Sequence, residues 1–171
     1  MPKPPIPPGK DRVDQLLRDW QRERPDLNAT ATAMAVVGRI LNLGRVLEAR
    51  ANDSLKTVGI HYTDLDVLAT LRRSGTPYRL TPTVLRQSVL ITSGAMTACL
   101  NRLEKAGLVI RNPENSDRRS LTATLTPKGV ALIDRAIVVR FAEAAQAVSE
   151  LSRTEQYELS KLLRKLGMSL S

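Results

Sequence analysis

The pattern that most constrains the fold lies in residues 81–125, where two short helical patterns are followed by two strand-like runs. A Thr-Pro pair begins the first helix, and the helix-breaking sequence Thr-Ser-Gly at residues 92–94 separates it from the second. The strand-like runs, residues 108–111 and 120–125, flank a loop that contains Pro, Asn and Asp. We therefore predict two helices joined by a tight turn and followed directly by a β-hairpin.

The second of these helices has two distinct faces. Ser93 can cap it, because a serine side chain accepts a hydrogen bond from the first turn of the backbone. The apolar positions recur at helical spacing and are predicted to face the core: Met96, Cys99, Leu100 and Leu103. The opposite face holds small and hydrogen-bonding residues: Gly94, Thr97, Ala98, Asn101, Arg102 and Lys105. Such a face suits the major groove of DNA, because small residues allow close approach and polar side chains reach base edges.

Most of the remaining chain has helical periodicity. Residues 11–22 and 30–51 place apolar residues every three or four positions, and so do the C-terminal segments. Thr63 with Asp66, and a Ser-x-x-Glu motif at residue 152, have the spacing of capping boxes. The terminal helices carry more apolar surface than one small head can cover. The predicted fold is mainly α with a small β-hairpin wing, in which a winged helix-turn-helix head is joined to a helical dimerisation region.

The positive charge of the chain is concentrated in its middle. Of a formal net charge of +9, residues 72–140 supply most, with 12 Lys and Arg against 4 Asp and Glu. Residues 1–71 hold 10 against 9, and residues 141–171 hold 4 against 4. Clustered cations favour a polyanionic partner, because phosphate contacts release condensed counterions. The distribution favours nucleic acid over an anionic membrane, and we predict double-stranded DNA.

Composition and motifs argue against several other classes. Cys99 is the only cysteine and His61 the only histidine, so the chain lacks the ligands for a four-coordinate zinc site, and no metal or cofactor is predicted. No apolar run has the length of a signal peptide or a membrane span, so we expect a cytoplasmic chain without membrane contact. We expect no enzyme, because no nucleophile elbow, phosphate-binding glycine loop or paired-carboxylate arrangement occurs.

The stretch ITSGAMTACLNRLEKAGLVIRNPENSDRRSLTATLTPKG contains RLE, AGLV, DRRS and LTPKG in a specific order and spacing. With these motifs it resembles the recognition helix and wing of the MarR family of winged-helix regulators, and the resemblance covers about residues 31–168. DLDVLATLRRSGTPYRLTP is similar to the helix and loop before the helix-turn-helix. WQRERPDL, residues 20–27, resembles a branch with an extra N-terminal helix that responds to urate and other small anionic metabolites.

The resemblance implies a homodimer whose terminal helices interlock and hold two winged heads over successive major grooves of a palindromic operator. We expect a disordered Pro-rich tail at residues 1–10 and a single domain at residues 11–171. Within that domain, residues 11–58 and 127–168 are expected to form the dimerisation helices. Residues 61–126 are expected to form the winged helix-turn-helix.

In the wing, Asp117 and Arg119 occupy the Asp-x-Arg pattern of the family, in which the carboxylate supports an arginine that inserts into the minor groove. Without a preceding helix-turn-helix, the same residues would suit an ordinary charged hairpin tip. Arg118 and Arg111 are interpreted as phosphate contacts. The predicted DNA-binding residues are Ser93, Thr97, Asn101, Arg102, Lys105, Arg118 and Arg119.

The resemblance also implies a small-molecule effector. Trp20 and Asp66 match two pocket positions of the urate-responsive branch, although Trp20 alone could be a packing residue and Asp66 alone a helix cap. In that branch the third pocket position is an arginine that neutralises an anionic ligand, and in this chain Cys99 occupies that position. A buried anion without a cation is costly, so a less charged effector or another basic side chain remains open. The predicted ligand-binding residues are Trp20, Asp66 and Cys99.

The predicted function is a sequence-specific DNA-binding transcriptional regulator, and more particularly a repressor released from its operator by a small molecule. Two alternatives stay open. One is a redox-sensing regulator that acts through Cys99, because some members of the family sense oxidants through one cysteine. The other is a winged-helix interaction module without DNA binding. DNA binding is favoured over that second alternative by the cations at Arg102, Lys105, Arg118 and Arg119.

Overall fold

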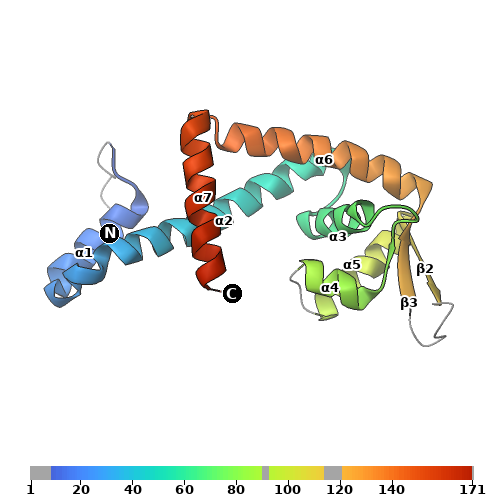
Figure 1. Ribbon diagram of the computed structural model, residues 1–171, viewed down its shortest axis with the longest axis horizontal. Coiled ribbons are helices and arrows are strands. Elements are labelled where there is room, and N and C mark those ends of the chain that lie inside the picture. The colour runs from blue at the N-terminus through green and yellow to red at the C-terminus, as the bar shows by residue number, and fades with distance from the viewer. Residues whose placement is uncertain (1–8, 90–92, 114–120, 171) are drawn as a thin grey trace, which may run out of the picture. The chain divides into compact units, whose positions relative to one another are not determined.

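The computed structural model describes residues 9–89, 93–113 and 121–170, and the chain divides into two compact units at residues 49 and 50. Helices make up most of both units, and a small antiparallel sheet lies in the second one (Figure 1). The predicted mainly α fold with a small β element is confirmed. Among the described helices, none has both the length and the apolar character needed to cross a bilayer.

The N-terminal unit contains two helices and a short connection. Helix α1 (Arg12–Glu23) ends just before Pro25, as predicted, because proline removes a backbone donor. Pro25 opens the short 3-10 helix η1 (Pro25–Thr30), which leads into α2 (Ala31–Leu55). The last turns of α2 belong to the second unit.

Contacts inside the N-terminal unit fix α1 against α2. Arg39 on α2 donates to the carboxylates of Asp11 and Asp14, which also form a capping box at the start of α1. Val13 is the buried residue of α1, and its Cγ1 would lie 3.2 Å from a Cβ added at Gly38. Glycine at position 38 therefore allows the two helices to approach closely.

The C-terminal unit begins with the end of α2 and the 3-10 helix η2 (Lys56–Val58). Three helices follow: α3 (Tyr62–Arg73), α4 (Pro82–Val89) and α5 (Ser93–Lys105). Their apolar faces meet in one core, whose largest fully buried side chains include Leu55, Leu68, Leu71, Leu85, Leu100, Leu103 and Ile133. We call residues 62–125 the head.

The sheet of the head has three strands: β1 (Arg79–Leu80), β2 (Val109–Pro113) and β3 (Leu121–Leu125). Strand β3 lies in the middle, with Val109 opposite Leu125 and Arg79 opposite Thr124. The predicted hairpin of residues 108–111 and 120–125 is confirmed, with shifted ends. Strand β1 was not predicted, because two residues are too few to show an alternating pattern.

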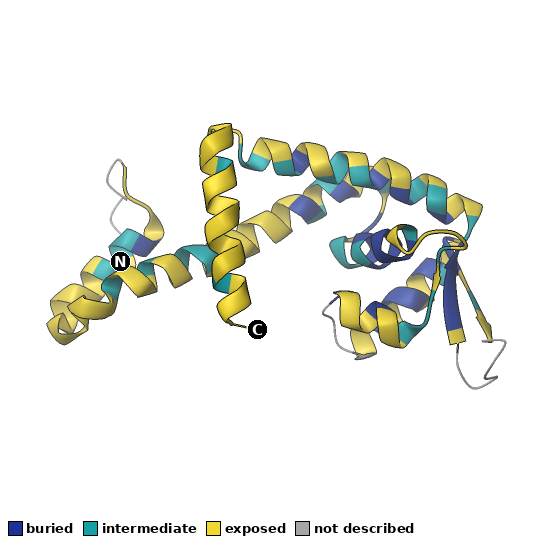
Figure 2. Cartoon of the chain, in the orientation of Figure 1, coloured by how far each residue is buried: buried dark blue, intermediate teal, exposed yellow. Residues whose placement is uncertain are grey.

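Two long helices complete the chain: α6 (Pro127–Ala147) and α7 (Arg153–Ser169). Both predicted caps are present, since Thr126 accepts from the Gly129 backbone and Ser152 forms a capping box with Glu155. Helix α7 has no buried residue in the described chain, and Figure 2 shows its surface as almost entirely exposed.

The predicted start of α3 needs a correction. Thr63 with Asp66 was expected to form the capping box, but His61 is the cap residue and Asp64 the third helical residue. The Asp64 carboxylate accepts the His61 backbone N–H at 3.2 Å. Two aspartates two positions apart offer alternative helix starts, and the residue earlier in the chain serves here, so Asp66 has no capping role.

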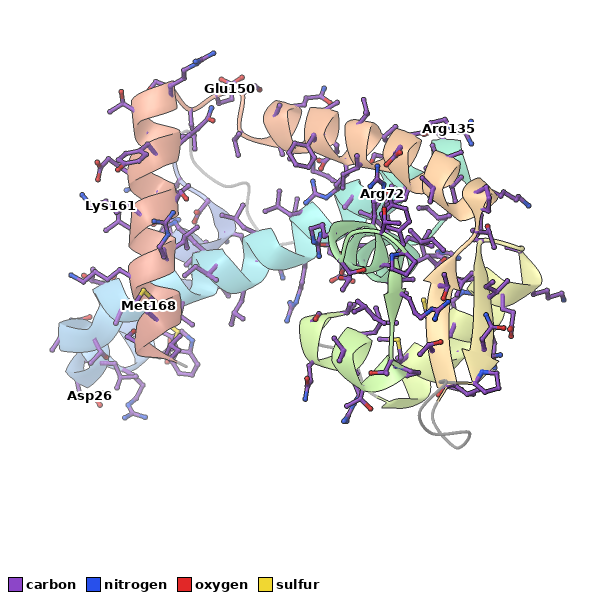
Figure 3. The ribbon with its side chains drawn as sticks, turned by 45° about the vertical axis from the view of Figure 1, so that its right-hand side comes forward. Asp26, Arg72, Arg135, Glu150, Lys161 and Met168 are labelled. Carbon is purple, nitrogen blue, oxygen red and sulfur yellow. The ribbon has the colours of Figure 1, made fainter. Side chains whose placement is uncertain are left out.

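Helix α6 is tied to the far end of α3 through Arg72. The Arg72 guanidinium donates to Asp134 of α6, with 2.9 Å between Nε and Oδ1. It also donates to the Tyr78 hydroxyl and lies 4.9 Å from the centre of the Tyr78 ring. Figure 3 shows Arg72 between α3 and α6. This cluster fixes the loop after α3 against α6.

Candidate nucleic-acid interface

Helix α5 has the two faces that its sequence predicts. Its inward residues are at most 3 % exposed: Met96, Cys99, Leu100 and Leu103. Its outward residues are exposed: Gly94, Thr97, Ala98, Asn101, Arg102 and Lys105. Ser93 is the first helical residue. Four of the predicted DNA-binding residues, Thr97, Asn101, Arg102 and Lys105, therefore lie together on one exposed surface.

The helices before α5 hold it in the head. Helix α4 buries Leu85 and Val89, and α3 contacts both α4 and α5. Residues 90–92, the predicted turn between α4 and α5, lie outside the described residues. The packing gives α5 one face in the core and one face toward solvent, which is the arrangement of a recognition helix.

The wing is described only at its base. Strands β2 and β3 pair from Val109 with Leu125 to Pro113 with Leu121. Asp117, Arg118 and Arg119, which carry the predicted wing contacts, lie outside the described residues. Their roles stay predictions.

An ion pair joins the base of the wing to α5. Arg111 of β2 donates to Glu104 of α5 through both Nε and Nη2, and the Nε bond is 2.9 Å long. The hydrogen bond from Arg111 lowers the pKa of the Glu104 carboxyl. Arg111, interpreted from the sequence as a phosphate contact, is thus engaged within the head. Its pairing fixes the orientation of the hairpin relative to the helix.

A second ion pair joins α5 to α3. Arg102 donates through Nη2 to Asp64 Oδ1 at 2.6 Å, and the Cys99 thiol donates to the same oxygen at 3.2 Å. The Asp64 side chain is 7 % exposed and that of Arg102 is 48 % exposed. This hydrogen bond raises the pKa of the Arg102 guanidinium. A buried carboxylate therefore supports the arginine that was predicted to contact DNA.

The same cluster sets the chemistry of Cys99. Burial raises the pKa of the Cys99 thiol to about 12, and the hydrogen bond to Asp64 adds to this effect. The neutral thiol donates to Asp64, whereas a thiolate would face a carboxylate in an apolar core. Because the pKa lies above its ordinary value of 9.0, the stabilising contribution of this group is fully present below pH 9. It is lost as the pH rises from there toward about 12.

The folded protein is expected to resist thiol reagents. At pH 8, Cys99 should react with 5,5′-dithiobis(2-nitrobenzoate) roughly 1000-fold more slowly in the folded chain than in the urea-unfolded chain, because the reactive species is the thiolate. Absorbance of the released thionitrobenzoate measures both rates on one sample. Equal rates would contradict the burial of this thiol and would restore a redox role for Cys99.

The three predicted ligand-binding residues divide between the two units. Trp20 is 57 % exposed on α1 and, with Leu17 and Met34, lines an apolar hollow of about 280 Å³ in the N-terminal unit. Asp66 is partly buried on α3, and burial raises the pKa of its carboxyl, partly opposed by Arg73 and Arg140. Cys99 lies within electrostatic range of Asp66. Within the C-terminal unit, Asp66 therefore has basic neighbours that the sequence did not reveal.

Sequence reasoning missed Asp64 as a member of this site. Asp64 lies three residues after His61, and this spacing is explained fully by a helix cap. The spacing therefore gave no indication that Asp64 also contacts α5. The contact with Arg102 spans 38 positions of the chain, so no local pattern could reveal it. Among the described residues, no group of three His, Cys, Asp or Glu side chains could hold a metal ion.

The fold and the exposed face of α5 define a winged helix-turn-helix protein, and the comparisons with known proteins agree. A profile described as MarR family matches residues 58–120. The transcriptional regulator PecS of Dickeya dadantii is 31 % identical over 158 residues, which cover 92 % of this chain and 94 % of PecS. A transcriptional repressor of Mycobacterium bovis, Mb2911, is 34 % identical over 134 residues, covering 78 % of this chain and 94 % of that protein.

The solved structures agree with the sequences. Sco3205, a MarR family regulator from Streptomyces coelicolor solved in complex with DNA, superposes with a TM-score of 0.71 at 26 % identity. The match covers 80 % of this chain and 89 % of Sco3205. This chain belongs to the MarR family. The expectation of a regulator rather than an enzyme is confirmed by that membership.

Proposed function

We propose that this chain is a sequence-specific DNA-binding transcription regulator whose helix α5 reads the major groove of a palindromic operator. The observation that carries the proposal is the exposed face of α5, on which Thr97, Asn101 and Lys105 stand beside two small residues. The polar side chains have the length and the donors to reach base edges. The wing residues Asp117 and Arg119 fit an added contact in the minor groove.

Selection from sheared genomic DNA tests this function. The purified chain is incubated with the fragments at several salt concentrations, and the retained DNA is sequenced. We expect enrichment of a palindromic sequence, with affinity that falls steeply as salt rises, because each phosphate contact releases counterions. Retention of no DNA at low salt would contradict the proposal and favour a winged-helix interaction module.

Gly94→Ala separates DNA contact from folding. A Cβ at Gly94 meets no atom of the described residues within 4 Å, so stability should be unchanged or raised. In the groove, the added methyl would meet the DNA where the start of α5 approaches it, and affinity for the selected sequence should fall about tenfold. Fluorescence anisotropy and thermal denaturation measure the two effects. Unchanged affinity would remove the start of α5 from the interface.

We propose that the active form is a homodimer, as palindromic operators require two heads. Support comes from the terminal helices, which leave large apolar side chains exposed, among them Leu41, Phe141 and Leu162. Light scattering over a dilution series should give twice the chain mass of 18.8 kDa. A persistent monomer would contradict this part of the proposal.

We also propose a repressor that a small-molecule effector releases from DNA, as in the metabolite-responsive branch. Asp66 supports this proposal, because its partly buried carboxyl lies near Arg73 and Arg140. These arginines can supply the positive charge that Cys99 does not. Calorimetry with urate as the probe, followed by addition of urate to the DNA complex, tests it. Heat of binding with loss of DNA is expected, and a decrease in that heat in Asp66→Asn would place Asp66 in the pocket.

A further inference from the structure

The Asp64 carboxylate accepts hydrogen bonds from the cap residue of α3 and from two side chains of α5. Its Oδ2 accepts the backbone N–H of His61, and its Oδ1 accepts the Cys99 thiol and the Arg102 guanidinium. Only 7 % of the Asp64 side chain is exposed. A buried carboxylate with three donors is held in one orientation, since rotation would leave buried polar groups unpaired.

One nitrogen of the Arg102 guanidinium is bound within the head, and the other two are available to a partner. Its Nη2 is bound to Asp64, while its Nε and Nη1 donate to none of the described residues. The side chain is 48 % exposed, and it follows Asn101 on the outward face of α5. A guanidinium is a planar fork with five donors, so one fixed corner determines where the others point.

We propose that Asp64 is a positioning residue for DNA recognition, which holds Arg102 so that its remaining N–H groups face the DNA. The inference rests on the proposed function of α5. An arginine fixed before binding loses less conformational entropy in the complex than a freely rotating one. The fixed geometry also distinguishes the correct sequence from others, because only one register places base or phosphate oxygens opposite the N–H groups.

Other roles of Asp64 predict different effects on DNA binding when its charge is removed. If Asp64 competed with phosphates for Arg102, removal of its charge would strengthen binding to every DNA sequence. If Asp64 served only the cap of α3, its removal would lower stability and would change binding to all sequences alike. A positioning role instead lowers the preference for the selected sequence over other DNA.

Asp64→Asn tests these roles, because asparagine keeps the size of the side chain and an acceptor for the His61 N–H but lacks the charge. Affinity is measured for a duplex of the sequence selected from genomic DNA and for a scrambled duplex of equal length. We expect the ratio of the two affinities to fall about tenfold, with affinity for the scrambled duplex unchanged or raised. Asp53→Asn makes the same charge change at an exposed pair with Lys56 and should leave the ratio unchanged.

A double-mutant cycle shows whether Asp64 acts through Arg102. In the Arg102→Ala background, Asp64→Asn should cause no further decrease in the ratio. Arg102→Lys keeps the positive charge but lacks the planar guanidinium, so it should lower the affinity ratio as Asp64→Asn does. If Asp64→Asn fails to fold, this variant tests the positioning role in its place. An unchanged or higher ratio in Asp64→Asn, additive effects in the cycle, or an unchanged ratio in Arg102→Lys would overturn the inference. A wild-type chain that binds both duplexes equally would instead overturn the proposed function.

Discussion

Replacing Gly129 with alanine is expected to lower the free energy of unfolding by about 3 kcal/mol. A Cβ at this position would lie 2.1 Å from the carbonyl oxygen of Leu108 and 3.0 Å from its carbonyl carbon. Both atoms are backbone, so no side-chain rotation can relieve the contact.

Hydrogen bonds prevent the backbone from moving aside. The Leu108 oxygen accepts the Thr126 N–H at 3.0 Å, and the Gly129 N–H donates to the Thr126 hydroxyl at 2.9 Å. Movement of either segment would break the cap of α6 or its junction with β2. Urea denaturation followed by circular dichroism, at equal chain concentrations, measures the loss. Gly94→Ala is the matched control, and an equal midpoint for Gly129→Ala and wild type would contradict the packing described here.

Leu162→Asp is expected to convert the proposed dimer into a monomer. Leu159, Leu162 and Leu163 recur at helical spacing on α7, and each is at least 43 % exposed in the single chain. A carboxylate inside an apolar interface would be buried without a partner, which is costly. The substitution should leave the head folded, because α7 has no buried residue in the described chain.

The effect on DNA follows from the loss of the second head. Two linked heads bind a palindrome far more tightly than one, so affinity for the selected sequence should fall roughly 100-fold. Light scattering and anisotropy measure the mass and the affinity on the same preparation. Arg164→Asp introduces the same side chain on the other side of α7, away from the leucines, and should remain dimeric. A dimeric Leu162→Asp would show that α7 is not at the interface.

Periodicity was sufficient to predict the two faces of α5. Each turn of a helix brings residues three and four apart onto one side, so Met96, Cys99, Leu100 and Leu103 had to share a face. The hairpin was predictable for a similar reason, since apolar runs flanking a turn-rich loop are local. The caps at Thr126 and Ser152 were local as well. These features need no knowledge of distant residues.

The parts that escaped prediction depend on contacts between distant segments. Asp64 meets Arg102 across the head, and Arg72 meets Asp134 over 62 positions of the chain. Strand β1 is defined only by its pairing with β3, because two residues have no pattern of their own. The start of α3 was misplaced because both Asp64 and Asp66 have the chemistry of a cap partner. Only tertiary packing decides between them.

The junction at the start of α6 has a mechanical consequence. The Thr126 hydroxyl donates to Gly107 at 2.8 Å, Lys128 donates to Ala106 at 2.8 Å, and Arg72 holds Asp134 two turns later. Because of these hydrogen bonds, we expect the first turns of α6 and the head to form one rigid body. A helix of 21 residues is about 32 Å long, so a tilt of about 5° at this joint displaces its far end by about 3 Å. Helix α6 therefore acts as a lever arm, in which a small angular change at the head becomes a displacement comparable to the width of an atom at its other end.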